Sequence, residues 1–247
     1  STYYSSNYAA TGDTFNITGA VLDTLDFDTT GTDITWDYST LTGNSQKKLI
    51  HRSPGQTGVS TLPWFLAYGI FNYYAGSNVN LSSTDGSTIA IGTIQQTNPN
   101  DYLLKTDAFL RLKGTSFNLS LNGLTYPVVT NYTKPDTLYR YPLTYNSTSR
   151  STAAYTLSVP TLIYRKVELN RRDTVKGWGT LITPYGTFAN CLKYVSTVTE
   201  IDSLSILDTP ILSADTIRYR ELKWFSPTKK YQLLTVCQLL IGGFFVT

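Results

Sequence analysis

The chain has 247 residues, of which 41% are hydrophobic and 15% are charged, and its net charge is +3. This length suits one large all-β domain or two small ones, and it can bury well over half of the unfolded surface without disulfide bonds. The basic residues are scattered and no nucleic-acid-binding module surrounds them, so nucleic acid is not expected as a partner.

The beginning of the chain is acidic. Residues 1–46 contain six aspartates and no lysine or arginine, which leaves 20 basic and 11 acidic side chains in the remainder. Two interpretations stay open: neutralisation between neighbouring strands of one molecule, or attraction between the acidic end of one molecule and the basic part of another.

A group of carboxylates within this acidic part suggests a calcium site on a loop, because hard oxygen ligands suit that ion. The spacing does not match an EF-hand, and aspartate in turns also caps backbone amides. The tentative calcium ligands are Asp23, Asp26, Asp28, Asp33 and Asp37. No other cofactor is expected.

Strand signals cover most of the chain. Residues 15–27 and 87–97 alternate between apolar and polar positions, and 115–129 form a hairpin pattern around Asn122-Gly123. Only residues 102–114 are compatible with a helix. The sequence therefore predicts an all-β fold, an antiparallel β-sandwich or a jelly-roll-like architecture.

Pro135 and Asp136 interrupt the strand pattern, which predicts a boundary between an N-terminal β domain, 1–133, and a C-terminal β domain, 134–247. A single continuous fold is the alternative. The longest apolar run, 233–246, is shorter than the roughly 20 residues of a membrane helix, so no membrane span is expected.

Residues 64–78 are unusually aromatic. Three interpretations are open: a core segment, a surface buried between subunits, or a platform on which sugar rings stack. The candidate ligand-binding residues are Trp64, Tyr68, Tyr73 and Tyr74.

A long pair of strands is predicted over residues 162–198, with a tight turn at Pro184-Tyr185-Gly186. Gly177 and Gly179 bracket Trp178, which indicates a bend or bulge that leaves room for the indole in the core. A ligand-stacking tryptophan is the alternative.

Three motifs carry a family resemblance: Thr30–Leu41, Val175–Leu204 and Tyr219–Val236. Together they resemble secreted proteins of Bacteroidota bacteria, which commonly carry a C-terminal sorting domain for type IX secretion. The resemblance implies an extracellular or outer-membrane-surface location and other cell-surface proteins as partners. It implies no catalytic residue. The chain contains no methionine, not even at position 1, so we expect a processed product. It stops directly after the apolar residues 243–246 without a polar tail, so we also expect further sequence beyond Thr247.

A recurrent Asp-Thr or Asp-Ser pair followed by a small aliphatic residue or Thr looks like the acceptor pattern for O-linked glycans in these bacteria. Turn formation in a threonine-rich chain explains the same pairs equally well. The tentative O-glycosylation sites are Thr24, Thr29, Thr137, Thr174, Ser203 and Thr216.

Groups for catalysis are scarce. His51 is the only histidine, lies among basic residues and is expected at the surface, where it lacks the partners of a catalytic triad. Cys191 and Cys237 are interpreted as a disulfide or as two buried thiols, and Glu221 is expected to pair with Arg218, Arg220 or Lys223.

The sequence therefore predicts a noncatalytic structural or adhesive protein of the secreted or cell-surface class, which self-associates into a homo-oligomer or filament. The alternative is a carbohydrate-binding module. A two-carboxylate hydrolase needs no histidine and remains the enzymatic alternative.

Overall fold

The computed structural model describes residues 1–21, 25–59, 61–68, 79–91, 94–121, 123–241 and 244–246. Within these ranges the fold is all-β and sandwich-like, as predicted, and its one α-helix is α1 (Thr61–Tyr68). Two 3-10 turns cover Ser5–Asn7 and Pro54–Gln56. No helix in these ranges is long and apolar enough to cross a membrane.

The strands, in chain order, are β1 (Thr2–Tyr3), β2 (Thr14–Ala20), β3 (Gly31–Asp37), β4 (Gly43–Arg52), β5 (Leu81–Thr84), β6 (Thr88–Ile91), β7 (Ile94–Lys105), β8 (Phe109–Leu121), β9 (Leu124–Arg140), β10 (Leu143–Thr144), β11 (Thr148–Val159), β12 (Ile163–Thr183), β13 (Gly186–Ile206), β14 (Thr209–Phe225), β15 (Leu234–Ile241) and β16 (Phe244–Val246).

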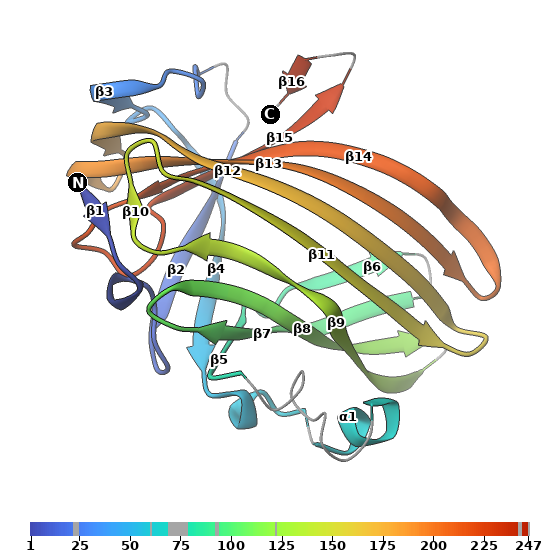
Figure 1. Cartoon of the computed structure of the whole chain (residues 1–247). Coiled ribbons are helices and arrows are strands. Elements are labelled where there is room, and N and C mark those ends of the chain that lie inside the picture. The colour runs from blue at the N-terminus through green and yellow to red at the C-terminus, as the bar shows by residue number, and fades with distance from the viewer. Residues whose placement is uncertain are drawn as a thin grey trace.

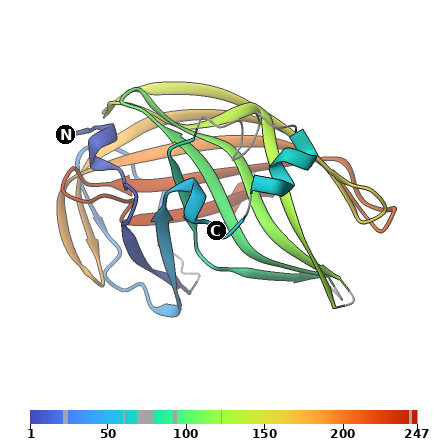
Figure 2. The same ribbon diagram turned by 90° about the horizontal axis from the view of Figure 1, so that it is seen from below.

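Fourteen of these strands form one sheet in the order β16-β15-β14-β13-β12-β11-β9-β8-β7-β5-β4-β2, with β6 paired to β7 and β3 paired to β12. All pairs in it are antiparallel except β3 with β12. β1 and β10 form a separate two-stranded sheet. Figure 1 shows β11 to β14 as long curved ribbons side by side, and Figure 2 shows them arching over the rest of the sheet.

The two faces of the sheet bury different clusters, because successive side chains of a strand point to opposite faces. Phe225 packs in an inner cluster with Tyr3, Tyr139 and Tyr194. Its neighbour Trp224 packs in an outer cluster, beneath the segment that contains β3. The curved sheet therefore has one core inside its curve and a second core under β3.

Two glycines of β12 allow β3 to approach. A Cβ on Gly179 would lie 1.9 Å from the carbonyl oxygen of Ile34, and a Cβ on Gly177 would lie 2.9 Å from the Trp36 ring. The predicted bulges are present next to both glycines. The space left by the missing side chains is occupied by β3 and not by the Trp178 indole. Trp178 itself is partly buried against the inner cluster, in agreement with the structural interpretation.

Two further predictions about turns are confirmed. Thr183 pairs with Gly186 across the predicted tight turn, where Gly186 has a φ of +134°. Leu121 pairs with Leu124 across the predicted hairpin of β8 and β9.

Residues 102–114, the one stretch that the sequence left compatible with a helix, do not form one. These residues form the end of β7, a turn and the start of β8, because the Thr106 hydroxyl accepts hydrogen bonds from the amides of Ala108 and Phe109 and reverses the chain. The actual helix, α1, lies in the aromatic stretch, with Pro63 in its first turn, where proline's missing N–H has no cost.

The predicted boundary at 133/134 falls inside β9. Residues of β9 on both sides of this position pair with β8, and Tyr132 and Lys134 pair with β11. The hydrogen-bonded sheet runs through the position without interruption.

Two aspartates of the acidic beginning of the chain form ion pairs within the molecule, as one of the two interpretations above expects. Asp28 forms an ion pair with Arg220, and Asp13 pairs with Lys230 at 2.7 Å. The fully buried Lys193 donates to the carbonyls of Phe27 and Thr29. The contacts of Arg220 and Lys193 hold residues 27–29 on the outer face of the sheet.

Candidate binding cleft

A cleft of about 1190 Å³ lies where the two ends of the curved sheet approach each other. One wall consists of β2 from Phe15 to Ala20, with parts of β4, β5 and β7. The opposite wall consists of residues 229–235, which lead from β14 into β15, and of the turn 183–185. Because β2 is the last strand of the sheet on its side, the cleft follows an unclosed seam.

Three contacts connect the walls. Lys230 binds Asp13, the ring of Tyr231 stacks on Phe15 with centroids 5.3 Å apart, and the Tyr185 hydroxyl donates to Thr18 Oγ1 at 2.6 Å. They fix the separation of the two sheet ends and leave the space between them open to solvent.

Among the described strands, β2 pairs on one side only, so its outer edge carries backbone groups without a strand partner. Gly12 has a φ of +95° and donates to the His51 carbonyl, while the His51 amide donates to the Asp13 carbonyl, which is the pattern of a glycine bulge. Backbone groups alternate in direction along a strand, so Phe15 and Ile17 bond to β4. The N–H and C=O groups of Asn16 and Thr18 therefore point outward.

Charges in the cleft are largely balanced. Lys47 binds Asp85 at 2.5 Å. Asp101 pairs with Ser83 across β7 and β5, and its side chain lies on the same face of the sheet as that of Lys47. No described side chain forms a hydrogen bond or ion pair with it. The residue is open to the cleft, but desolvation of its carboxyl by the surrounding protein, together with the Asp85 charge, raises its pKa to about 6.

His51 lies beside the cleft and not at the surface, so that prediction is wrong. The imidazole is 1% exposed and contacts the rings of Tyr8, Phe15 and Tyr231. Neither ring nitrogen has a hydrogen-bond partner among the described residues. Burial lowers the pKa of His51 to about 4, so the ring is neutral at physiological pH.

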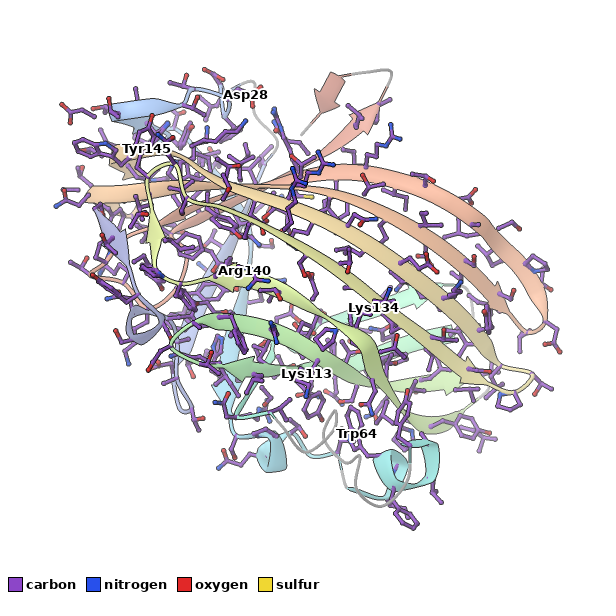
Figure 3. All side chains as sticks on the ribbon, in the orientation of Figure 1. Asp28, Trp64, Lys113, Lys134, Arg140 and Tyr145 are labelled. Atoms are coloured by element: carbon purple, nitrogen blue, oxygen red, sulfur yellow. The ribbon has the colours of Figure 1, made fainter. Side chains whose placement is uncertain are left out.

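The predicted sugar-binding aromatics are not brought to this cleft. Trp64 is fully buried and packs edge-on against Tyr102, with ring centroids 5.0 Å apart. Tyr68 packs beside it, and its hydroxyl accepts from the Asn131 amide. Trp64 belongs to α1, which Figure 3 shows below the sheet. Tyr73 and Tyr74 lie outside the described residues.

The described aspartates of the predicted calcium site act in other ways. Asp26 accepts from the Asp28 amide and the Thr29 hydroxyl, and Asp37 accepts from the Ser39 amide. Asp28 pairs with Arg220, and Asp33 is exposed in β3. No group of three or more possible ligands forms within the described ranges. Asp23 lies outside them.

The tentative glycosylation sites differ in access. Thr216 and Thr29 are exposed, although the Thr29 hydroxyl donates to Asp26. Thr174 and Ser203 are half-buried. Thr137 is 4% exposed and accepts from Arg111, so a glycan there would displace packed side chains. Thr24 lies outside the described residues.

Glu221 is paired as predicted, whereas the two cysteines do not form the disulfide that was one of their two interpretations. Glu221 pairs with Lys223, as expected, and also with Arg171, and these cations hold its pKa at about 2 against the opposing effect of burial. Cys191 and Cys237 are free thiols, the first buried and the second exposed, and burial raises the pKa of Cys191 to about 12.

The sequence indicated Tyr185 only as a turn residue and carried no signal for Asp101. Asp101 lines the cleft only because residues 229–235 form its opposite wall. Those residues are far away in the chain, so the sequence around Asp101 does not show that it lies in a cleft.

Comparison with known proteins returned no match. No protein-family model, curated protein or solved structure is significantly similar to this chain.

Proposed function

We propose that this chain is a noncatalytic, secreted or cell-surface protein with an adhesive role, and that it holds its partner in the cleft. The observation that carries the proposal is the open seam of about 1190 Å³, held at a fixed width by Asp13–Lys230 and Thr18–Tyr185. A preformed cleft spares a partner the cost of ordering the site.

The state of the ionisable groups supports binding as the role of the site. His51 is buried in neutral form, and Asp85 is bound to Lys47. Proton transfer needs a group that faces the substrate with a pKa near the working pH. Asp101 is the group in the cleft closest to this condition, so it is the residue to examine if turnover is found.

An adhesion assay tests this proposal. The labelled full chain is applied to coatings of gelatin, mucin, cellulose and chitin, and retention is measured. Gln96→Trp places an indole in the cleft and is expected to reduce retention, while Gln95→Trp, on the exposed neighbouring position of β7, is its control. Equal retention of the two variants, or release of a cleaved coating, contradicts the proposal.

Self-association is part of the same proposal. Residues 209–218 of β14 pair with β13 on one side, while β15 pairs only with residues 219–224, which leaves a free edge in the described sheet. Ile211 is 55% exposed along this edge. Free edges can pair with further chains. Native mass spectrometry should show oligomers that weaken in Ile211→Lys, and a strictly monomeric wild-type chain contradicts this part.

A carbohydrate-binding role is the second candidate. Tyr185 favours it, because its ring is 71% exposed at the opening of the cleft and its hydroxyl is fixed by Thr18. Calorimetry with cellohexaose, xylohexaose and chitohexaose should then show binding that Tyr185→Ala abolishes and Tyr185→Phe retains. Binding unaffected by Tyr185→Ala contradicts this role.

A further inference from the structure

One wall of the cleft is the edge of a strand. β2 pairs with β4 alone among the described strands, and it contributes every residue from Phe15 to Ala20 to the cleft lining. On the other wall lie Leu234 and Thr235 of β15, which pair with β14 on one side only.

Main-chain groups of β2 are available in the cleft. The bulge at Gly12 sets the alternation, so Asn16 and Thr18 direct their N–H and C=O groups away from β4. An exposed strand edge of this kind is a template for another strand. Proline and lysine, the residues that usually guard such edges, do not occur in β2.

We propose that an extended polypeptide segment binds in the cleft as an additional strand on β2. This inference rests on the proposed adhesive function and names its partner class. Backbone hydrogen bonds to Asn16 and Thr18 supply affinity, and the pockets for alternate side chains supply selectivity.

The lining defines the segment. The face of β2 that carries Phe15 meets Leu49 of β4 and Tyr231 of the opposite wall, and these three residues offer a partly buried apolar surface. On the outer side, Thr18 and the hydroxyl of Tyr185 offer polar contacts. The bound segment therefore has apolar residues at alternate positions, polar residues between them and no proline at its centre.

An extended peptide fits these observations better than a glycan does. A sugar chain uses rings and side-chain hydroxyls, and it has no regular row of donors and acceptors with the spacing of a strand. The cleft also exceeds the roughly 300–1,000 Å³ of sites for small molecules, which favours a chain-like occupant.

The test selects peptides of seven residues, the length of β2, from a displayed random library with the full chain as target. Thr18→Pro removes one outward N–H and keeps pairing to β4, whereas Thr18→Val keeps that N–H. Both variants lose the hydroxyl that Tyr185 contacts. We expect the selected peptide to bind Thr18→Pro about tenfold more weakly than Thr18→Val, because one main-chain bond is lost and the proline ring obstructs the edge.

Two further measurements distinguish a loss of peptide binding from a loss of folding. Asn16→Pro and Asn16→Ala form a second matched pair, and thermal melting reports whether each variant folds. In the wild-type chain, peptide binding should slow hydrogen exchange of the Asn16 and Thr18 amides about tenfold or more. Unchanged exchange of these amides overturns the inference even if every proline variant unfolds.

The proposal is also overturned if no alternating peptide is selected, or if Thr18→Pro and Thr18→Val bind it equally. Binding of cellohexaose or chitohexaose that depends on the Tyr185 ring and not on the Thr18 amide overturns strand addition as well. In that case retention in the adhesion assay still stands, so failure of this inference and failure of the adhesive function are distinguishable.

Discussion

The Tyr185 hydroxyl lies 2.6 Å from Thr18 Oγ1, although 167 positions separate the two residues in the chain. The contact joins the β12–β13 turn to the edge strand β2. It brings the first strand of the curved sheet to the turn between two of its longest strands. The cleft exists because this contact and the Asp13–Lys230 ion pair connect the sheet ends without pairing them as strands.

Replacing Gly179 with alanine should detach β3 from β12. The added Cβ would lie 1.9 Å from the Ile34 carbonyl oxygen, so backbone must move, and we expect a loss of about 3 kcal/mol in the free energy of unfolding. Gly55→Ala is the control, because its Cβ meets nothing within 4 Å. Chemical denaturation monitored by tryptophan fluorescence measures both, and equal midpoints would show that β3 does not need this glycine.

The stability of the protein should fall as the pH decreases from about 6.5 to about 4. The pKa of His51 is about 4 in the folded chain and about 6.5 when unfolded, so the unfolded chain binds more protons in this window. The linked loss is at most about 3 kcal/mol. Urea denaturation at several pH values measures it, with His51→Phe as the comparison.

Asp101 acts in the opposite direction over part of the same range. Its raised pKa means that the folded chain binds more protons than the unfolded chain between about 3.8 and about 6, so this group favours folding at lower pH. The His51 effect is therefore read from the difference between wild type and His51→Phe. Parallel curves for these two proteins would contradict it.

Arg171→Met should destabilise the fold strongly. Arg171 is 5% exposed and binds Asp136 and Glu221, and its removal leaves Asp136 buried without its cation. Breaking such a pair costs about 3–5 kcal/mol. The control is Lys166→Met, which breaks an ion pair with Glu168 at the surface and should leave the thermal midpoint unchanged. Similar midpoints for the two variants would contradict the prediction.

Trp64→Ala should reduce stability rather than ligand affinity. Its side chain is fully buried between α1 and the sheet, and truncation of a buried tryptophan costs about 3–5 kcal/mol. Leu66→Ala on the same helix is the control, because Leu66 is 73% exposed and its loss should change the free energy of unfolding by less than about 0.5 kcal/mol. Equal effects of the two substitutions would show that α1 does not pack as described.

Local alternation of side chains is sufficient to predict the all-β fold and the turns at Gly123 and Gly186. The sequence left a helix possible over 102–114 because a turn capped by the Thr106 side chain is hard to tell from a helix by composition. The sequence also identified Gly177 and Gly179, but it could not show that they make room for β3, which comes from another part of the chain.

The alternation of residues along the chain determined that this protein is built from strands, because that signal depends only on near neighbours. Tertiary structure alone decided which edges and faces stay open. His51 and Trp64 are buried by segments distant in sequence, and the cleft lies between β2 and residues 229–235. Burial and cleft formation depend on pairings across the whole chain, which short-range patterns do not encode.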